Sequence, residues 1–175
     1  MRRKEANDRI VGLCYSTVGV HPCSTKQFDS FEGGPLQLIS KLRALATESM
    51  ENGYTVAFGE VGLDYDRLFL SSKEQQLKYF EMQLDLAEEL QLPLFLHMRA
   101  ACDDFIRLLE PRLSRLPRKG LVHSFTGTKQ DAKKILDLGL DIGINGCSLK
   151  SDENVEVLRS LSMDRLQIET DGPWV

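Results

Sequence analysis

Short apolar runs alternate with helical patterns along almost the whole chain, and this alternation limits the possible folds more than any other feature. Runs as apolar as these are usually covered on both faces, as the strands of parallel sheets are. Serial strand–helix units therefore predict either an open doubly wound sheet or a (β/α)8 barrel. The runs lie at residues 15–20, 55–58, 92–96, 120–122, 140–144 and 166–168.

Helix signals separate these runs. Pro35 suits a first helical turn, and Asn52-Gly53 is a natural stop for the helix that follows it. Ser71 with Glu74 predicts a capping box for a helix whose apolar positions recur at helical spacing. No glycine-rich phosphate-binding loop follows the first run, which argues against a nucleotide-binding Rossmann fold. Further helices are expected at residues 103–109 and 129–138 and after a cap at Ser151.

The net charge of −4 and the pI near 5.4 argue against a module that binds nucleic acid mainly through a basic surface. An enzyme that holds phosphates through bound metal ions stays possible, because the ions then supply the positive charge. We expect one domain over residues 15–175, preceded by a polar segment over residues 1–14.

Cysteine usage and hydropathy indicate an intracellular protein. The four cysteines form no CxxC pair, which is typical of a reducing compartment. We find no signal peptide and no apolar run that approaches a membrane span, so no membrane partner is expected. No protein partner is inferred either. The cysteines are Cys14, Cys23, Cys102 and Cys147.

Chemistry-bearing side chains follow the apolar runs. All three histidines of the chain, His21, His97 and His123, stand at the ends of predicted strands, and Glu60 and Asp171 stand at the ends of two more. In a parallel barrel the carboxyl ends of the strands share one face, and that face holds the active site. These five residues are therefore expected to converge.

Two imidazoles and two carboxylates suit Zn²⁺, Mn²⁺ or Mg²⁺. We expect Glu60 to bridge two ions, with His97 and His123 on one and Asp171 on the other. Two such ions activate a water molecule and steady the leaving oxygen of a phosphodiester. Asp171 is also a candidate to accept the proton of that water.

Plainer interpretations stay open for each residue. A single histidine after an apolar run is often packed in the core, and Asp171 could cap a helix. Glu60 could pair with Arg67 or Arg99. Arg99 could meet a substrate phosphate or an acid, and Glu169 could brace the site or form an ordinary salt bridge.

Ordered motifs give the chain a family resemblance. They resemble those of the TatD family of metal-dependent deoxyribonucleases, and residues 145–150 (NGCSLK) look like the eukaryotic branch. The matching stretches are residues 19–22 (GVHP), 59–65 (GEVGLDY), 92–99 (LPLFLHMR), 123–127 (HSFTG) and 169–174 (ETDGPW).

The resemblance implies a TIM barrel of the amidohydrolase-like type that hydrolyses DNA with two divalent ions, as a 3′ exonuclease of the nucleus or cytoplasm. Glu60, His97, His123 and Asp171 match the metal-ligand positions, with Glu60 bridging. His21 matches a position that contacts the substrate phosphate.

The chain also departs from the family pattern. Nothing before Tyr15 resembles the family's first strand with its HxH pair, and no strand follows Val175 to close a barrel. We therefore expect an incomplete barrel of about six of the eight strand–helix units. Two alternative functions stay open: a metallohydrolase that acts on an amide or lactone, and an inactive remnant.

Overall fold

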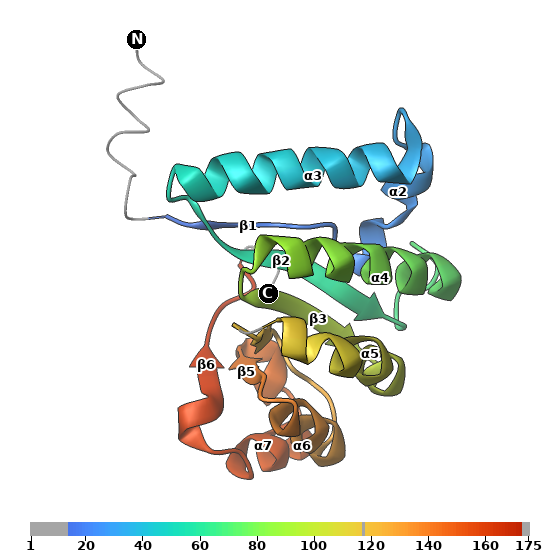
Figure 1. Ribbon diagram of the computed structural model, residues 1–175. Helices are drawn as coiled ribbons and strands as arrows, with labels where there is room; N and C mark the ends of the chain where they lie inside the picture. The colour runs from blue at the N-terminus through green and yellow to red at the C-terminus, as the bar shows by residue number, and fades with distance from the viewer. Residues whose placement is uncertain (1–13, 117, 173–175) are drawn as a thin grey trace.

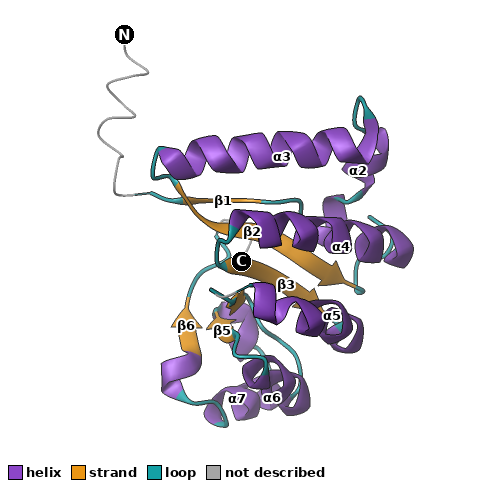
Figure 2. Cartoon of the chain, viewed as in Figure 1, coloured by secondary structure: helices purple, strands orange, loops and turns teal. Residues whose placement is uncertain are grey.

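The computed structural model describes residues 14–116 and 118–172, so almost all of the polar segment expected over residues 1–14, and Trp174, lie outside the described residues. Every described strand belongs to one parallel sheet, in the order β1-β2-β3-β4-β5-β6 (Figures 1 and 2). The strands are β1 (Ser16–Val18), β2 (Thr55–Asp64), β3 (Leu94–Arg99), β4 (Gly120–Val122), β5 (Asp141–Ile144) and β6 (Leu166–Ile168).

This strand order decides between the two predicted folds. A doubly wound sheet reverses its strand order at a switch point, whereas here each new strand is added on the same side of the previous one. β1 and β6 form the two edges of the described sheet and do not pair with each other. The prediction of an incomplete (β/α)8-type barrel is confirmed.

Helices fill the connections between the strands. In Figure 1, α3 and α4 run side by side along β1 and β2, while α5, α6 and α7 follow the later strands. No helix of the described residues is long and apolar enough to cross a membrane. The helices are α2 (Lys26–Ser30), α3 (Gly34–Glu51), α4 (Lys73–Leu90), α5 (Cys102–Leu109), α6 (Lys129–Asp137) and α7 (Asp152–Arg159), with short 3-10 turns η1 (Pro22–Ser24), η2 (Glu110–Arg115), η3 (Gly146–Leu149) and η4 (Met163–Arg165).

The core lies between the sheet and these helices. Phe58 and Leu63 of β2 are fully buried, as are Phe80 and Leu84 of α4, whose helical spacing predicted them on one inner face. Phe80 also stacks on Phe105 of α5, with ring centroids 5.6 Å apart. The apolar period of α4 therefore fixes which side of this helix meets the sheet.

The cap of α4 differs by one residue from the prediction. Ser72 accepts a hydrogen bond from the Gln75 backbone N–H at 3.3 Å, and the Gln75 side chain accepts one from Ser72 N–H at 3.1 Å. Ser71 is instead fully buried, and its hydroxyl donates to the Cys23 carbonyl. The prediction of a Ser71–Glu74 box was wrong because tertiary packing uses Ser71 elsewhere.

Strand β2 is longer than its apolar run and extends to Asp64. Its pairing with β3 is irregular between Gly59 and Val61 and then continues, with Gly62 opposite His97. A Cβ atom at position 62 would lie 1.9 Å from the His97 carbonyl oxygen, so only glycine allows this close approach. Glu60 and His97 consequently lie within their strands, and the prediction that they stand at the strand ends was wrong.

Candidate metal centre

Three imidazoles surround one carboxylate oxygen. Glu60 Oε1 lies 2.8 Å from His97 Nδ1, 2.5 Å from His123 Nε2 and 3.4 Å from His21 Nε2. Glu60 comes from β2 and His97 from β3. His123 directly follows β4, and His21 lies shortly after the end of β1. Four of the residues predicted to converge from separate strands thus do converge.

The donor set fits a divalent ion. His21 Nε2 lies 3.3 Å from His97 Nδ1 and 3.4 Å from Glu60 Oε1. A tetrahedral ion with ligand bonds of about 2.1 Å separates its ligand atoms by about 3.4 Å. Ligand atoms of these three residues all lie within 4.8 Å of one another. His21, which we expected at the substrate, therefore stands among the possible ligands as well.

Asp64 belongs to the centre but was not predicted there. Its side chain is 1% exposed, and Oδ2 lies 3.1 Å from His97 Nε2, on the far side of the ring from Glu60. Its second oxygen, Oδ1, is buried without a hydrogen-bond partner among the described residues. Asp64 lies four residues after Glu60 on β2 and ends that strand, and this spacing was the signal that sequence reasoning overlooked.

The charges of the cluster support one another. Burial raises the pKa of Glu60, but hydrogen bonds from His123, His21 and His97 outweigh it and hold this pKa well below its usual range. Burial lowers the pKa of His97, but the contacts with Asp64 and Glu60 outweigh burial, so this pKa is raised above its usual value. The pKa of Asp64 is lowered because the contact with His97 outweighs burial. Both carboxyl groups are therefore ionised at neutral pH.

Two buried glutamines of α4 hold the backbone that carries the centre. Gln83 accepts from Val20 N–H at 2.7 Å and donates to the Val20 carbonyl at 3.0 Å, one residue before His21. Gln76 accepts from Asp64 N–H at 2.7 Å and donates to the Asp64 carbonyl at 2.8 Å. These side chains stand seven residues apart on the same helix face. They tie α4 to the ends of β1 and β2.

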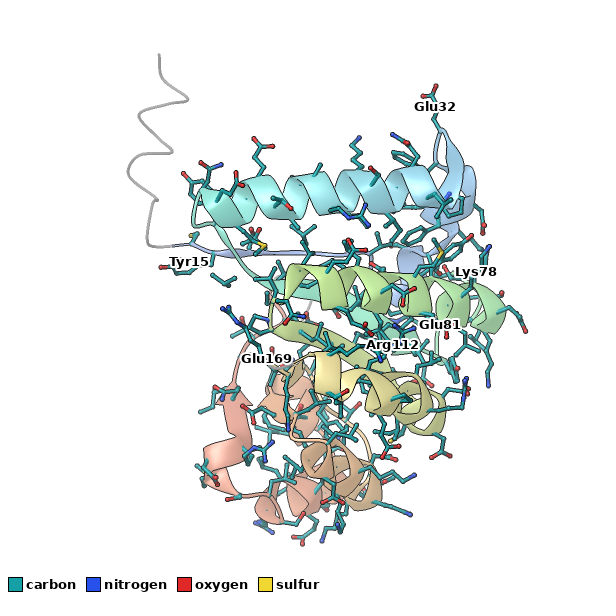
Figure 3. All side chains as sticks on the ribbon, viewed as in Figure 1. Tyr15, Glu32, Lys78, Glu81, Arg112 and Glu169 are labelled. Atoms are coloured by element: carbon teal, nitrogen blue, oxygen red, sulfur yellow. The ribbon has the colours of Figure 1, made fainter. Side chains whose placement is uncertain are left out.

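Glu169 braces the opposite side of the centre, at the point where the chain leaves β6 (Figure 3). Its Oε1 accepts from Ser124 N–H at 2.5 Å, and its Oε2 lies 3.8 Å from His123 Nδ1. Gly143 leaves room for it, because a Cβ there would lie 2.5 Å from Glu169 Oε1. Burial raises the pKa of Glu169, and the charge of Asp171 acts in the same direction.

Within the described residues, Arg99 forms no ion pair with Glu60. Asp171 is half-buried after β6, and its charge acts on Glu169, which contacts His123. Arg99 is exposed at the end of β3, where its Nε donates to Asp66 at 2.9 Å. Arg67 lies 3.9 Å from Asp64. The plainer interpretation, in which Glu60 pairs with one of these arginines, was therefore wrong.

A groove of about 1090 Å³ opens among the segments that follow the strands. Arg99 lies on its wall, two residues after His97 on β3. The groove brings together segments that follow β2, β3, β4 and β5, all at the carboxyl edge of the sheet. Its lining includes Tyr65, Arg99, Thr126, Cys147, Lys150 and Asn154.

Comparison with known proteins shows the family of the chain. The family described as TatD related DNase matches residues 2–175. This chain belongs to the TatD family. The resemblance seen in its motifs is confirmed, and so is the amidohydrolase-like barrel to which it pointed.

Individual TatD relatives cover most of the chain. A protein named Deoxyribonuclease Tat-D from Schizosaccharomyces pombe is 50% identical over 159 residues, which are 91% of this chain and 51% of the relative. A 3′-5′ ssDNA/RNA exonuclease TatD from a Rahnella species is 43% identical over 171 residues, which are 96% of this chain and 60% of the relative.

Solved structures agree with the fold. An uncharacterized amidohydrolase from Saccharomyces cerevisiae superposes with a TM-score of 0.80 at 36% identity, covering 91% of this chain and 56% of that one. A TatD family hydrolase from Entamoeba histolytica gives a TM-score of 0.79 at 37% identity, covering 90% and 50%. The chain thus spans about half the length of the relatives that it matches.

Proposed function

We propose that this chain is a metal-dependent deoxyribonuclease of the 3′-5′ exonuclease type. The observation that carries the proposal is the convergence of three histidines on one oxygen of Glu60, in a chain of the TatD family. The names of its relatives, which act on DNA, support the substrate class.

We assign two divalent ions to the centre, Mg²⁺, Mn²⁺ or Zn²⁺. Glu60, His97 and His123 would hold the first, and Glu60 with Asp171 would hold the second. Such ions, when bound, lower the pKa of water and neutralise charge on the phosphate. Asp64 and Glu169 support the assignment, because a carboxylate behind a ligating imidazole fixes its orientation and tautomer.

Proton transfer and phosphate binding are assigned to side chains of the protein. In hydrolysis, the water oxygen forms a bond to phosphorus, the bond from phosphorus to the 3′ sugar oxygen breaks, and that oxygen takes up a proton from solvent. Asp171 accepts the proton of the attacking water, as a carboxylate near its reacting group can do. His21 contacts the phosphate beside Glu60, and Arg99 binds a second phosphate in the groove.

A paired assay tests the proposal. The purified chain is expected to degrade single-stranded DNA from its 3′ end in the presence of Mg²⁺ or Mn²⁺, and EDTA or Glu60→Gln abolishes this activity. The control is Glu32→Gln, which changes an exposed acid between α2 and α3 (Figure 3) and leaves the rate unchanged. Cleavage that survives EDTA would contradict the proposal.

A substrate panel separates the alternatives. Hydrolysis of amides or lactones without DNA cleavage would assign the centre to a different metallohydrolase, because the same donors suit both chemistries. Absence of any turnover together with loss of metal on gel filtration would indicate an inactive protein. The free thiols of Cys23, Cys102 and Cys147 support a reducing location, the nucleus or cytoplasm.

A further inference from the structure

Three consecutive apolar side chains are exposed in the segment that follows Asp64. Leu68 is 41% exposed, Phe69 is 76% exposed and Leu70 is 40% exposed. A run of this kind is unfavourable in water and is normally retained only where it serves a function. These residues lie in the segment 65–72, which joins the end of β2 to the start of α4 and which we name the β2–α4 loop.

The β2–α4 loop is held in place at several points. Tyr65 N–H donates to the Arg99 carbonyl at 2.9 Å, and the Tyr65 hydroxyl donates to Asp104 at 2.7 Å. Leu70 N–H donates to the Arg67 carbonyl at 2.9 Å and closes a turn around Phe69. The Phe69 ring is therefore presented to solvent by a fixed backbone.

The same turn places a cation next to a carboxylate that contacts His97. Arg67 Nε lies 3.9 Å from Asp64 Oδ2, and that oxygen lies 3.1 Å from His97 Nε2. Lys26 adds a second cation, whose ammonium group donates to the Phe69 carbonyl at 3.4 Å. Asp66, which precedes Arg67 in the chain, is already paired with Arg99.

We propose that Phe69 is a stacking platform for an unpaired base of the DNA strand whose phosphate is bound at the centre, and that Arg67 and Lys26 contact the adjoining backbone. The inference rests on the proposed nuclease function. Aromatic rings beside cations are the arrangement by which proteins hold single strands without reading their sequence. A protein partner or a second copy of the chain would not require a guanidinium next to the carboxylate that contacts His97.

This arrangement restricts the substrate. A base stacks on a side chain only when its face is free, so the Phe69 platform selects single-stranded or frayed ends over blunt duplex. Because stacking uses the π-face that every base has, we expect little preference among the four bases.

Binding measurements test the platform without turnover. The probe is a short fluorescein-labelled single-stranded oligodeoxynucleotide with a phosphorothioate backbone, titrated with the full chain and read by fluorescence anisotropy. Phe69→Ala is expected to weaken binding roughly 5- to 100-fold, and Phe69→Trp to retain it. The control is Met163→Ala, which removes an 80% exposed apolar side chain before β6, at the opposite edge of the sheet.

An abasic probe makes the test specific to stacking. Removal of the bases near the 3′ end should weaken binding to the unchanged chain by about the same factor as Phe69→Ala, and the two changes together should cost no more than either alone. Equal binding of both probes by both proteins would overturn the inference, as would a Phe69→Ala variant that alters only the oligomeric state. Failure of the nuclease proposal shows separately, as absence of metal-dependent cleavage of an ordinary oligonucleotide.

Discussion

At the scale of single residues, Asp64 and Glu60 contact opposite nitrogens of the His97 ring. Glu60 contacts Nδ1 of the ring and Asp64 contacts Nε2. An imidazole held on both sides has one orientation. In the proposed metal-bound centre, Asp64 would accept the proton on Nε2 of His97, which would leave Nδ1, the nitrogen that faces Glu60, to the metal ion.

Replacement of Asp64 tests this role. We expect Asp64→Ala to lower the affinity for a divalent ion by roughly 10- to 100-fold, because the ring loses the partner that orients it. The measurement is competition for Zn²⁺ against a chromogenic chelator. Asp66→Ala removes an exposed carboxylate two residues away and should leave the affinity unchanged; equal affinities of both variants would refute the role.

At the scale of elements, α4 positions the centre although it contributes no ligand. Gln76 and Gln83 reach from its inner face to backbone groups beside Asp64 and His21. On its outer face, Arg112 of η2 binds Glu88 at 3.0 Å and also Asp85 (Figure 3 shows Arg112 beside the helix). The helix is therefore fixed on both sides, which holds the strand ends at a constant separation.

Loss of the two hydrogen bonds between Gln83 and the Val20 backbone, the Gln83 bracket, should lower the stability of the fold. Gln83→Met keeps the volume but leaves Val20 N–H and its carbonyl buried without partners, and each unsatisfied group costs about 1–3 kcal/mol. We expect the free energy of unfolding in urea to fall by roughly 2–5 kcal/mol. Gln37→Met, at an exposed site on α3, should change it by less than about 0.5 kcal/mol. Similar midpoints for the two variants would show that the bracket is not needed.

The hydrogen bond between Tyr65 of the β2–α4 loop and Asp104 of α5 should make the stability of the fold depend on pH. Hydrogen bonds from Lys73, Tyr65 and Arg107 lower the pKa of Asp104. The stability from this carboxylate is present above its unfolded pKa of about 3.9 and is lost as the pH falls through the lower folded value. Burial and the contact with Asp104 raise the pKa of Tyr65. Its contribution is present below about pH 10 and is lost as the pH rises through the folded value.

The free energy of unfolding in urea, measured across the pH range, checks the loss of stability at low pH (the acid limb) and at high pH (the alkaline limb). Asp104→Asn should flatten the acid limb by about 1 kcal/mol, since the carboxylate is partly screened by solvent. Tyr65→Phe should flatten the alkaline limb and leave the acid limb in place. An unchanged pH profile in both variants would rule out this network as the source.

At the scale of the whole molecule, β1 and β6 form the two edges of the sheet within the described residues. Among those residues each pairs on one side only, and Ile168 of β6 is 94% exposed. Tyr15, before β1, is 61% exposed (Figure 3). The metal centre draws its side chains from β1 through β4 and its braces from β6, so a bound ion would link segments across most of the sheet.

Metal should therefore stabilise the fold as a whole. With free ion at 100 times its Kd, we expect about 2.7 kcal/mol of stabilisation, or a rise in Tm of roughly 5–10 °C for a chain of this size. Differential scanning calorimetry with and without EDTA measures this rise. Glu60→Gln should remove this rise. An equal Tm with and without EDTA would contradict the assignment of a metal centre.

The sequence alone determined the strand–helix alternation and most of the cluster. Parallel strands place their carboxyl ends at one edge, and residues in the later part of neighbouring strands lie close together there, so the sequence predicted that His21, His97 and His123 would converge even though His97 lies within its strand. The same reasoning found Glu60, whose exact partners it left open. These predictions succeeded because they depend on the order of the elements and not on the register between them.

Only the tertiary structure decided which atoms meet. The irregular pairing after Gly59 turns Glu60 toward three imidazoles, and the pairing of Gly62 with His97 places Asp64 behind that ring. The bond between Gln83 and Val20 joins residues 63 positions apart, and no local pattern encodes it. Such contacts are set by strand register and by helix packing across the sheet, where a shift of one residue exchanges one face for the other.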